Sequence, residues 1–161
     1  MAKHVLNIQQ NVFDFILLGI NCNENQYRVL SLLNDTLDLE LALGNYIPLN
    51  LDNQIFNFSL FRFTDDILRI EYFFIPNLSN YNPENKSEEQ NLFAEMRIDT
   101  RARLVKELPE TDFFLIIKGE EMHGLGERIK ERLKKVKELL NIQIIQVEDL
   151  PSRKDRKSTR L

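Results

Sequence analysis

The chain has 161 residues, 43% of them hydrophobic, with eleven Phe and a formal net charge of −4. This length suits one domain with its own core, and the hydrophobic content argues against a disordered chain. The negative charge excludes a general nucleic-acid polycation, and the single Cys22 excludes an internal disulfide and fits a reducing compartment. Because no apolar run approaches the ~18 residues of a membrane span, we expect a cytoplasmic protein.

The first third of the chain predicts a strand, a helix and a second strand. Residues 12–20 are rich in aromatic and branched residues, which favours a buried strand. Residues 27–36 place apolar side chains on one helical stripe, after a polar turn that can cap the helix. Residues 37–43 alternate leucine with polar or small residues, which indicates a strand, although leucine, glutamate and alanine also favour a helix. Residues 44–53, with Pro48 among them, are predicted to be a loop.

Residues 54–75 have the alternation of a β-hairpin, with its turn at Thr64, Asp65 and Asp66. Their many Phe residues favour a core over a base-stacking platform, because RNA-binding sheets interleave exposed aromatics with Gly, Lys and Arg. The polar residues 76–91 predict a mobile surface loop. Residues 92–98 are ambiguous, and Asp99 or Thr100 is expected to cap a helix that ends before Pro109.

Phe113 to Ile117, FFLII, predicts a central strand that is apolar on both faces. Glu107 and Asp112 lie nearby and suggest acid/base chemistry, but an Asp at a strand start more often accepts hydrogen bonds from loop amides. Gly119, Gly124 and Gly126 follow, where phosphate loops occur. A Gly-Lys-Ser/Thr sequence is missing and two glutamates would repel phosphate, so this segment is interpreted as a turn.

Residues 125–140 predict an amphipathic helix with a basic outer side, followed by a strand over 142–147. Glu131 is placed to pair with Lys135 on that helix. The tail, residues 151–161, has five basic residues against Asp155 and is predicted to be disordered. Helix and tail together suggest a polyanion-binding surface, whose candidate residues are Arg128, Arg132, Lys135, Arg153, Lys154, Arg156 and Lys157. The alternative is a solvated helix face and tail without a ligand.

The stretch before the central strand resembles the signature of an uncharacterised bacterial family named after its motif, IPExxxVDY. Val105, Lys106 and Glu107 fall on I-P-E, while Thr111, Asp112 and Phe113 fall on V-D-Y; Lys106 and Thr111 depart from the pattern. Segments 13–20, 27–34 and 58–77 also resemble the family, in the same order. The resemblance implies no activity, substrate or cofactor.

Catalytic and metal motifs are missing from the sequence. His4 and His123 are the two histidines, and no CxxC, HExxH or GxSxG pattern occurs, so we expect neither a metal nor a cofactor. An enzyme would have to use Asp112, His123 and Glu107 in one pocket.

These patterns predict one α+β domain over residues 1–150, with a mixed, mainly antiparallel sheet and helices mostly on one face. A non-catalytic interaction or regulatory module with a protein partner is the favoured function. The alternative is an RNA-associated accessory factor that uses the basic helix and tail.

Overall fold

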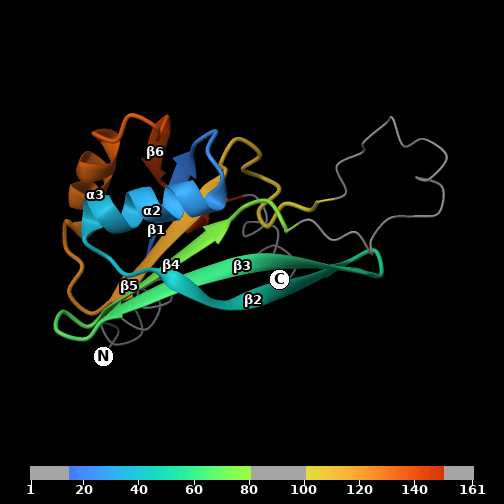
Figure 1. Ribbon diagram of the computed structural model, residues 1–161, viewed down its shortest axis with the longest axis horizontal. Helices are drawn as coiled ribbons and strands as arrows, with labels where there is room; N and C mark the ends of the chain where they lie inside the picture. Colours follow the sequence, from blue (N-terminus) through green and yellow to red (C-terminus); the bar gives the residue numbers. More distant parts are fainter. Residues whose placement is uncertain (1–14, 81–100, 151–161) are drawn as a thin grey trace, which may run out of the picture.

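A six-stranded antiparallel sheet with two helices on one face forms the fold (Figure 1). The computed structural model describes residues 15–80 and 101–150. The strands are β1 (Phe15–Asn21), β2 (Ala42–Leu51), β3 (Gln54–Asp65), β4 (Ile70–Pro76), β5 (Phe113–Gly119) and β6 (Asn141–Ile144). The helices are α2 (Gln26–Leu37), α3 (Leu125–Lys134) and the short 3-10 helix η4 (Val147–Asp149). None of the helices in these two ranges is long and apolar enough to cross a membrane.

The strand order is β2-β3-β4-β5-β1-β6, and each neighbouring pair is antiparallel. The predicted α+β class is therefore confirmed, with the helices on one face, whereas the described strands form an entirely antiparallel sheet and not the predicted mixed one. Strands β5 and β6 run in the same direction because β1 lies between them, so α3 connects two parallel strands. Likewise, α2 connects β1 to the distant edge strand β2, which carries the chain across the helix-bearing face.

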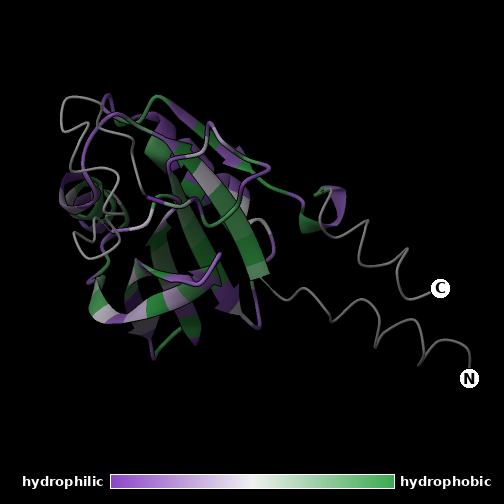
Figure 2. Cartoon of the chain, turned by 90° about the vertical axis from the view of Figure 1, so that its right-hand side faces the viewer, coloured by the Kyte–Doolittle hydropathy of each residue, from purple (hydrophilic) through white to green (hydrophobic). Residues whose placement is uncertain are grey.

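The main core lies between the sheet and the two helices. Leu18 of β1, Leu115 and Ile117 of β5, Leu33 of α2 and Leu133 of α3 are completely buried there. Phe113 stacks on Phe74 of β4 with ring centroids 5.4 Å apart. Figure 2 shows hydrophobic residues running along the strands, as expected for a sheet that packs side chains on both of its faces.

A second apolar cluster lies on the other face of the sheet. Phe56, Phe58 and Ile75 are buried there, packed against Ala102 and Leu104 and against alternate residues of β2. Strand β3 pairs with β4 only over Phe61–Asp65, so residues 45–60 extend beyond β4 as a two-stranded arm (Figure 1). We call these residues the arm.

Several predicted elements are confirmed. The structure contains the predicted strand that ends near residue 20, the helix over 27–36, the hairpin of β3 and β4, the central strand β5 and the final strand β6. The hairpin turn lies at residues 66–69 instead of Thr64–Asp66, and β6 ends at Ile144 instead of residue 147. Asn25 is the N-cap of α2, and its side-chain oxygen accepts a hydrogen bond from the Arg28 amide at 2.9 Å.

Two predictions between residues 37 and 53 are wrong. Leu37 ends α2, and residues 38–41, which begin with the left-handed Asp38, connect the helix to β2 without strand pairing. Only Ala42 and Leu43 of the predicted strand belong to a strand. Leu39 and Leu41 are buried while Asp38 and Glu40 are exposed. The alternation in the sequence therefore reflects alternating burial of the side chains, although these residues do not pair with another strand. The predicted loop at 44–53 is instead most of strand β2 and its turn. Pro48 does not break this strand, because β2 lies at the edge of the sheet, where a missing N–H is tolerated.

Three further predictions differ from the structure. Residues 101–112 contain no helix, so the helix before Pro109 is wrong over its described part. Helix α3 ends at Lys134 instead of residue 140; Leu139 is buried and Leu140 is 61% exposed. The predicted loop at 76–91 begins with buried Asn77 and Ser79, and its residues 81–91 lie outside the described ranges, as do 92–100.

Candidate interaction surface

Asn77 holds residues 105–113, which resemble the IPExxxVDY signature and which we call the motif stretch, against the sheet. Its side chain is fully buried; its Oδ1 accepts a hydrogen bond from the Val105 amide at 2.8 Å. Its Nδ2 donates to the carbonyls of Thr111 at 2.8 Å, Leu108 at 3.0 Å and Val105 at 3.4 Å. Residues 105–112 form no helix or strand, so their backbone groups lack the partners that these elements provide. The buried Asn77 amide supplies hydrogen bonds to four of them instead.

The motif positions at the start of β5 also have structural contacts. The Asp112 carboxylate accepts a hydrogen bond from the Cys22 amide at 2.9 Å, and the Asp112 amide donates to the Ile20 carbonyl at 3.0 Å. These bonds join the end of β1 to the start of β5. The buried ring of Phe113 belongs to the main core. Asp112 therefore accepts a hydrogen bond from a backbone amide outside its own loop, as a structural carboxylate does.

The Cys22 thiol is held in the same region. It is buried, and its Sγ lies 3.2 Å from the Glu138 carbonyl, to which it donates. Burial raises the pKa of this thiol, and the charges of Glu24, Asp112 and Glu138 raise it further, while a hydrogen bond from the Glu24 amide opposes them. A buried thiol with a raised pKa is a poor nucleophile at neutral pH.

The three candidate acid/base residues do not converge. Asp112 precedes β5 and His123 follows it, so a seven-residue strand of about 20 Å separates them. His123 and Glu107 are exposed, and Glu107 lies in the loop held by Asn77. The condition that an enzyme of this kind would require is not met by these residues. Among the described residues, no group of three His, Cys, Asp or Glu side chains could hold a metal ion.

The three glycines span the connection from β5 to α3: Gly119 ends β5, Gly124 precedes α3 and Gly126 lies in its first turn. Gly124 is the N-cap of α3 with a φ of 70°, a left-handed conformation that glycine adopts at little cost. A Cβ atom at Gly126 would lie 3.1 Å from Ile16, so this glycine permits close packing of α3 on β1. Both glycines thus have structural reasons for their positions.

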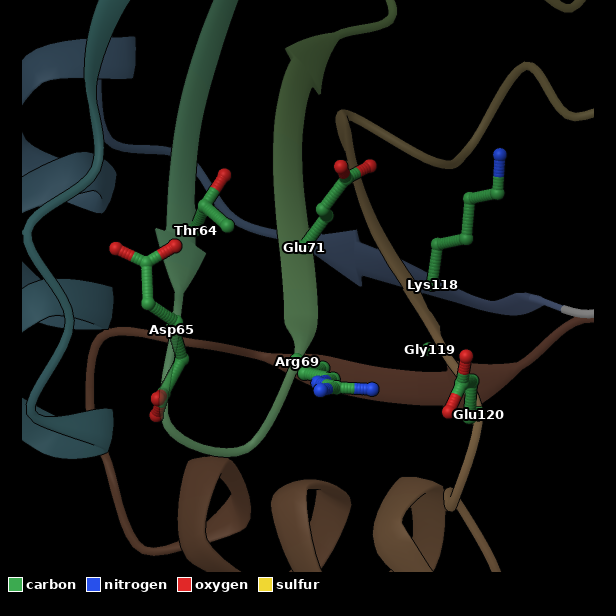
Figure 3. A pocket seen from close by; sticks show the side chains of 8 residues that line it. Thr64, Asp65, Arg69, Glu71, Lys118, Gly119 and Glu120 are labelled. Atoms are coloured by element: carbon green, nitrogen blue, oxygen red, sulfur yellow. The ribbon is translucent and has the colours of Figure 1, made fainter.

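A hollow of about 540 Å³ lies near this segment, at the turn between β3 and β4 (Figure 3). Thr64, Glu71 and Lys118 project from three neighbouring strands, with Arg69 and Glu120 at its end. Four carboxylates line it against two cations, so an anionic ligand would be repelled. The hollow is open, and its mixed charges indicate solvated side chains.

The candidate polyanion-binding residues are only partly available. Arg132 of α3 donates to the Thr36 carbonyl and lies 3.5 Å from the Asp38 carboxylate, so it connects α3 to the end of α2. Arg128 of α3 is exposed, and so is Lys135 at the helix end. Glu138 lies 3.6 Å from Arg28 of α2. The predicted partner of Glu131 is wrong: Glu131 pairs with Lys134 at 3.4 Å. Arg153, Lys154, Arg156 and Lys157 lie outside the described residues.

The arm has an uncharged face on the same side of the sheet as α2, and its residues are exposed except for the buried Ser59. Register places Tyr46 opposite Ser59 and Leu43 opposite Phe61, whose ring Tyr27 of α2 contacts edge-on at 6.2 Å. Tyr27, Leu43 and Tyr46 are 62%, 44% and 52% exposed. We call this face the shelf; its residues are Tyr27, Leu43, Tyr46, Pro48, Asn50, Ile55, Asn57 and Ser59.

A second hollow, of about 430 Å³, adjoins the shelf at Tyr27. Its walls include Asn80, which exchanges hydrogen bonds of 3.0 and 3.2 Å with Ser59 of the shelf. Arg101, Arg103 and Glu24 also line it. The uncharged shelf therefore has a charged rim on one side, the arrangement typical of protein interfaces.

Sequence reasoning missed this surface because it interpreted β2 as a loop. A signal was nevertheless present: residues 45–60 contain Asp52 as their single charged residue, although most of the chain is highly charged. Ile47, Leu49 and Leu51 also alternate with polar residues and Pro48. Neither a protein-family model nor a curated protein matches the chain. The resemblance to the IPExxxVDY family stays a prediction.

Proposed function

We propose that the protein is a non-catalytic interaction module that binds a protein partner through the shelf. The observation that carries this proposal is the exposure of Tyr27, Leu43 and Tyr46 on a surface without charged residues. Tyrosine is enriched and charge is depleted at the centres of protein interfaces, because large amphipathic rings gain contact area at low entropic cost.

The fold supports the proposal by holding these side chains in place. Tyr27 rests on the buried Phe61, and β2 is aligned with β3 along its whole length. The opposite side of the arm packs on Ala102 and Leu104, which supports the arm where β4 is missing. A rigid surface loses little conformational entropy on binding.

The test is a low-salt pull-down with the full chain from its native cytoplasm, split into nuclease-treated and untreated halves. A double variant, Leu43→Ser with Tyr46→Ser, removes exposed apolar groups from the shelf. The matched control, Ile67→Ser with Leu68→Ser, removes two side chains that are 93% and 63% exposed at the distant β3–β4 turn. We expect a nuclease-resistant protein partner that the shelf variant loses and the control retains. Retention by the shelf variant would refute the proposal.

RNA association through α3 and the tail is the second candidate, supported by the exposed Lys135 and the basic composition of residues 151–161. It predicts that partners disappear after nuclease treatment and that binding falls steeply with salt. Deletion of Arg153 to Leu161 should then abolish binding.

A further inference from the structure

We propose that strand β2 is a dimerisation edge, which pairs in antiparallel fashion with β2 of a second copy and joins the two sheets. This inference goes beyond the proposed function, because it uses the backbone edge of the arm and not the side chains of the shelf. Strand β2 is the longest edge of the sheet: it has ten residues, whereas the other edge strand, β6, has four.

The backbone groups that face outward can be assigned from the turn. Asp52 and Asn53 have φ values of 50° and 63°, which defines a two-residue turn flanked by Leu51 and Gln54. In such a hairpin, Leu51 and every second residue before it bond to β3, so Tyr46, Pro48 and Asn50 face outward. An independent contact agrees: the carbonyl of Asn57, the partner of Pro48, points away from β2 and accepts from the Asn80 amide at 2.8 Å.

In one register, β2 strands of two copies satisfy each other's outward-facing backbone N–H groups. If Pro48 faces Pro48 of the second copy, Tyr46 of each copy faces Asn50 of the other. Each of these two symmetry-related Tyr46–Asn50 pairs exchanges two hydrogen bonds. The prolines leave only carbonyls unbonded, which proteins tolerate better than unbonded N–H groups. On the other face, Ile47 then lies opposite Leu49 of the second copy. Both side chains already pack against the second apolar cluster, which would continue across the junction.

The lack of charge on β2 also favours a second copy of the chain as the partner of this edge. Charged side chains, above all Lys, protect many natural edge strands from pairing, and β2 carries none; its protection consists of Pro48 and the irregularity between Leu43 and Asn45. A two-fold axis brings like residues together, so an uncharged edge avoids the repulsion that a charged one would suffer. Pro48 and the irregularity between Leu43 and Asn45 limit pairing to a short segment, which disfavours open-ended addition of further strands.

The experiment is sedimentation velocity on the purified full chain across the micromolar range, without any partner. We expect a dimer, and we expect Asn50→Pro to raise its dissociation constant at least about tenfold, because it removes an outward N–H from each copy and spares the β3 ladder. Asn50→Ala is the matched control, since it removes the side chain and keeps the N–H; it should still dimerise. Pro48→Ala restores two central donors and should tighten the dimer by about tenfold.

A chain that stays monomeric throughout this range overturns the inference, even if its edge binds an extended segment of another protein. A dimer that Asn50→Pro leaves unchanged overturns it as well, because the copies then meet elsewhere. If circular dichroism shows that Asn50→Pro does not fold, Pro48→Ala decides the question. The shelf variant Leu43→Ser with Tyr46→Ser keeps its backbone donors and should remain dimeric, so a failed shelf and a failed edge are distinguishable.

Discussion

Replacement of Asn77 by alanine should cost about 3 kcal/mol of unfolding free energy, because three short hydrogen bonds of about 1 kcal/mol each would be lost. These bonds join Asn77 to the Val105 amide and to the Leu108 and Thr111 carbonyls, at 2.8 to 3.0 Å. The fourth contact, of 3.4 Å to the Val105 carbonyl, should add little. The side chain is fully buried, so water has poor access to replace it.

Urea denaturation followed by circular dichroism would measure this loss as a shift of the midpoint at unchanged slope. Hydrogen exchange at the Val105 amide should accelerate in the same variant. Asn77→Asp is the matched variant, because it preserves shape but turns an oxygen toward the carbonyls. Its carboxyl should have a raised folded-state pKa, so its destabilisation should be greatest at neutral pH and diminish as pH falls through that pKa. A loss below about 0.5 kcal/mol for Asn77→Ala would show that Asn77 does not anchor the motif stretch.

Three further predictions follow from local contacts. Asp112→Ala should destabilise the protein by about 1–2 kcal/mol in urea denaturation, whereas Asp112→Asn, which keeps an acceptor for the Cys22 amide, should cost less; equal losses would refute the structural role. Gly124→Ala should lower stability by about 1 kcal/mol through its positive φ, and Gly124→Asn by less; a neutral alanine variant would contradict the left-handed cap. The Cys22 thiol should react with a thiol reagent only after unfolding, and, because its folded-state pKa is raised, it should reduce stability as pH rises above ~8.5; rapid native-state labelling would show that it is accessible.

Strands and helices were predictable where burial followed the period of the element. The alternation of β3 and β4, the apolar run of β5 and the stripe of α2 all satisfy this condition. The alternation of residues 37–43 wrongly predicted a strand there, because Leu39 and Leu41 are buried in the core although their segment does not pair with another strand. The end of α3 was missed because no Gly or Pro follows Lys134; packing of Leu139 into the core overrides local helix propensity there.

The candidate surface depends on information that is distant in the sequence. Whether Pro48 breaks a strand or lies on its free edge depends on the position of β2 in the sheet, which local sequence does not specify. Asn77 contacts backbone groups 28 to 34 residues away, and it looked like one of many loop asparagines. Charge depletion over residues 45–60 was visible in the sequence and could have directed attention to the arm.

The position of β1 has a consequence for how the chain acquires its structure. This first described strand pairs with β5 and β6, so Leu18 lies opposite Leu115 and Ile144, more than ninety residues later in the chain. The β2–β3–β4 meander needs only neighbouring residues and can form early, whereas closure of the long loop around β1 carries a large entropic cost. During synthesis on the ribosome, β1 therefore waits with both edges bare until β5 and β6 emerge. We therefore expect the pairing of β1 with β5 and β6 to be a slow step of folding, during which the apolar side chains of β1 are accessible to chaperones.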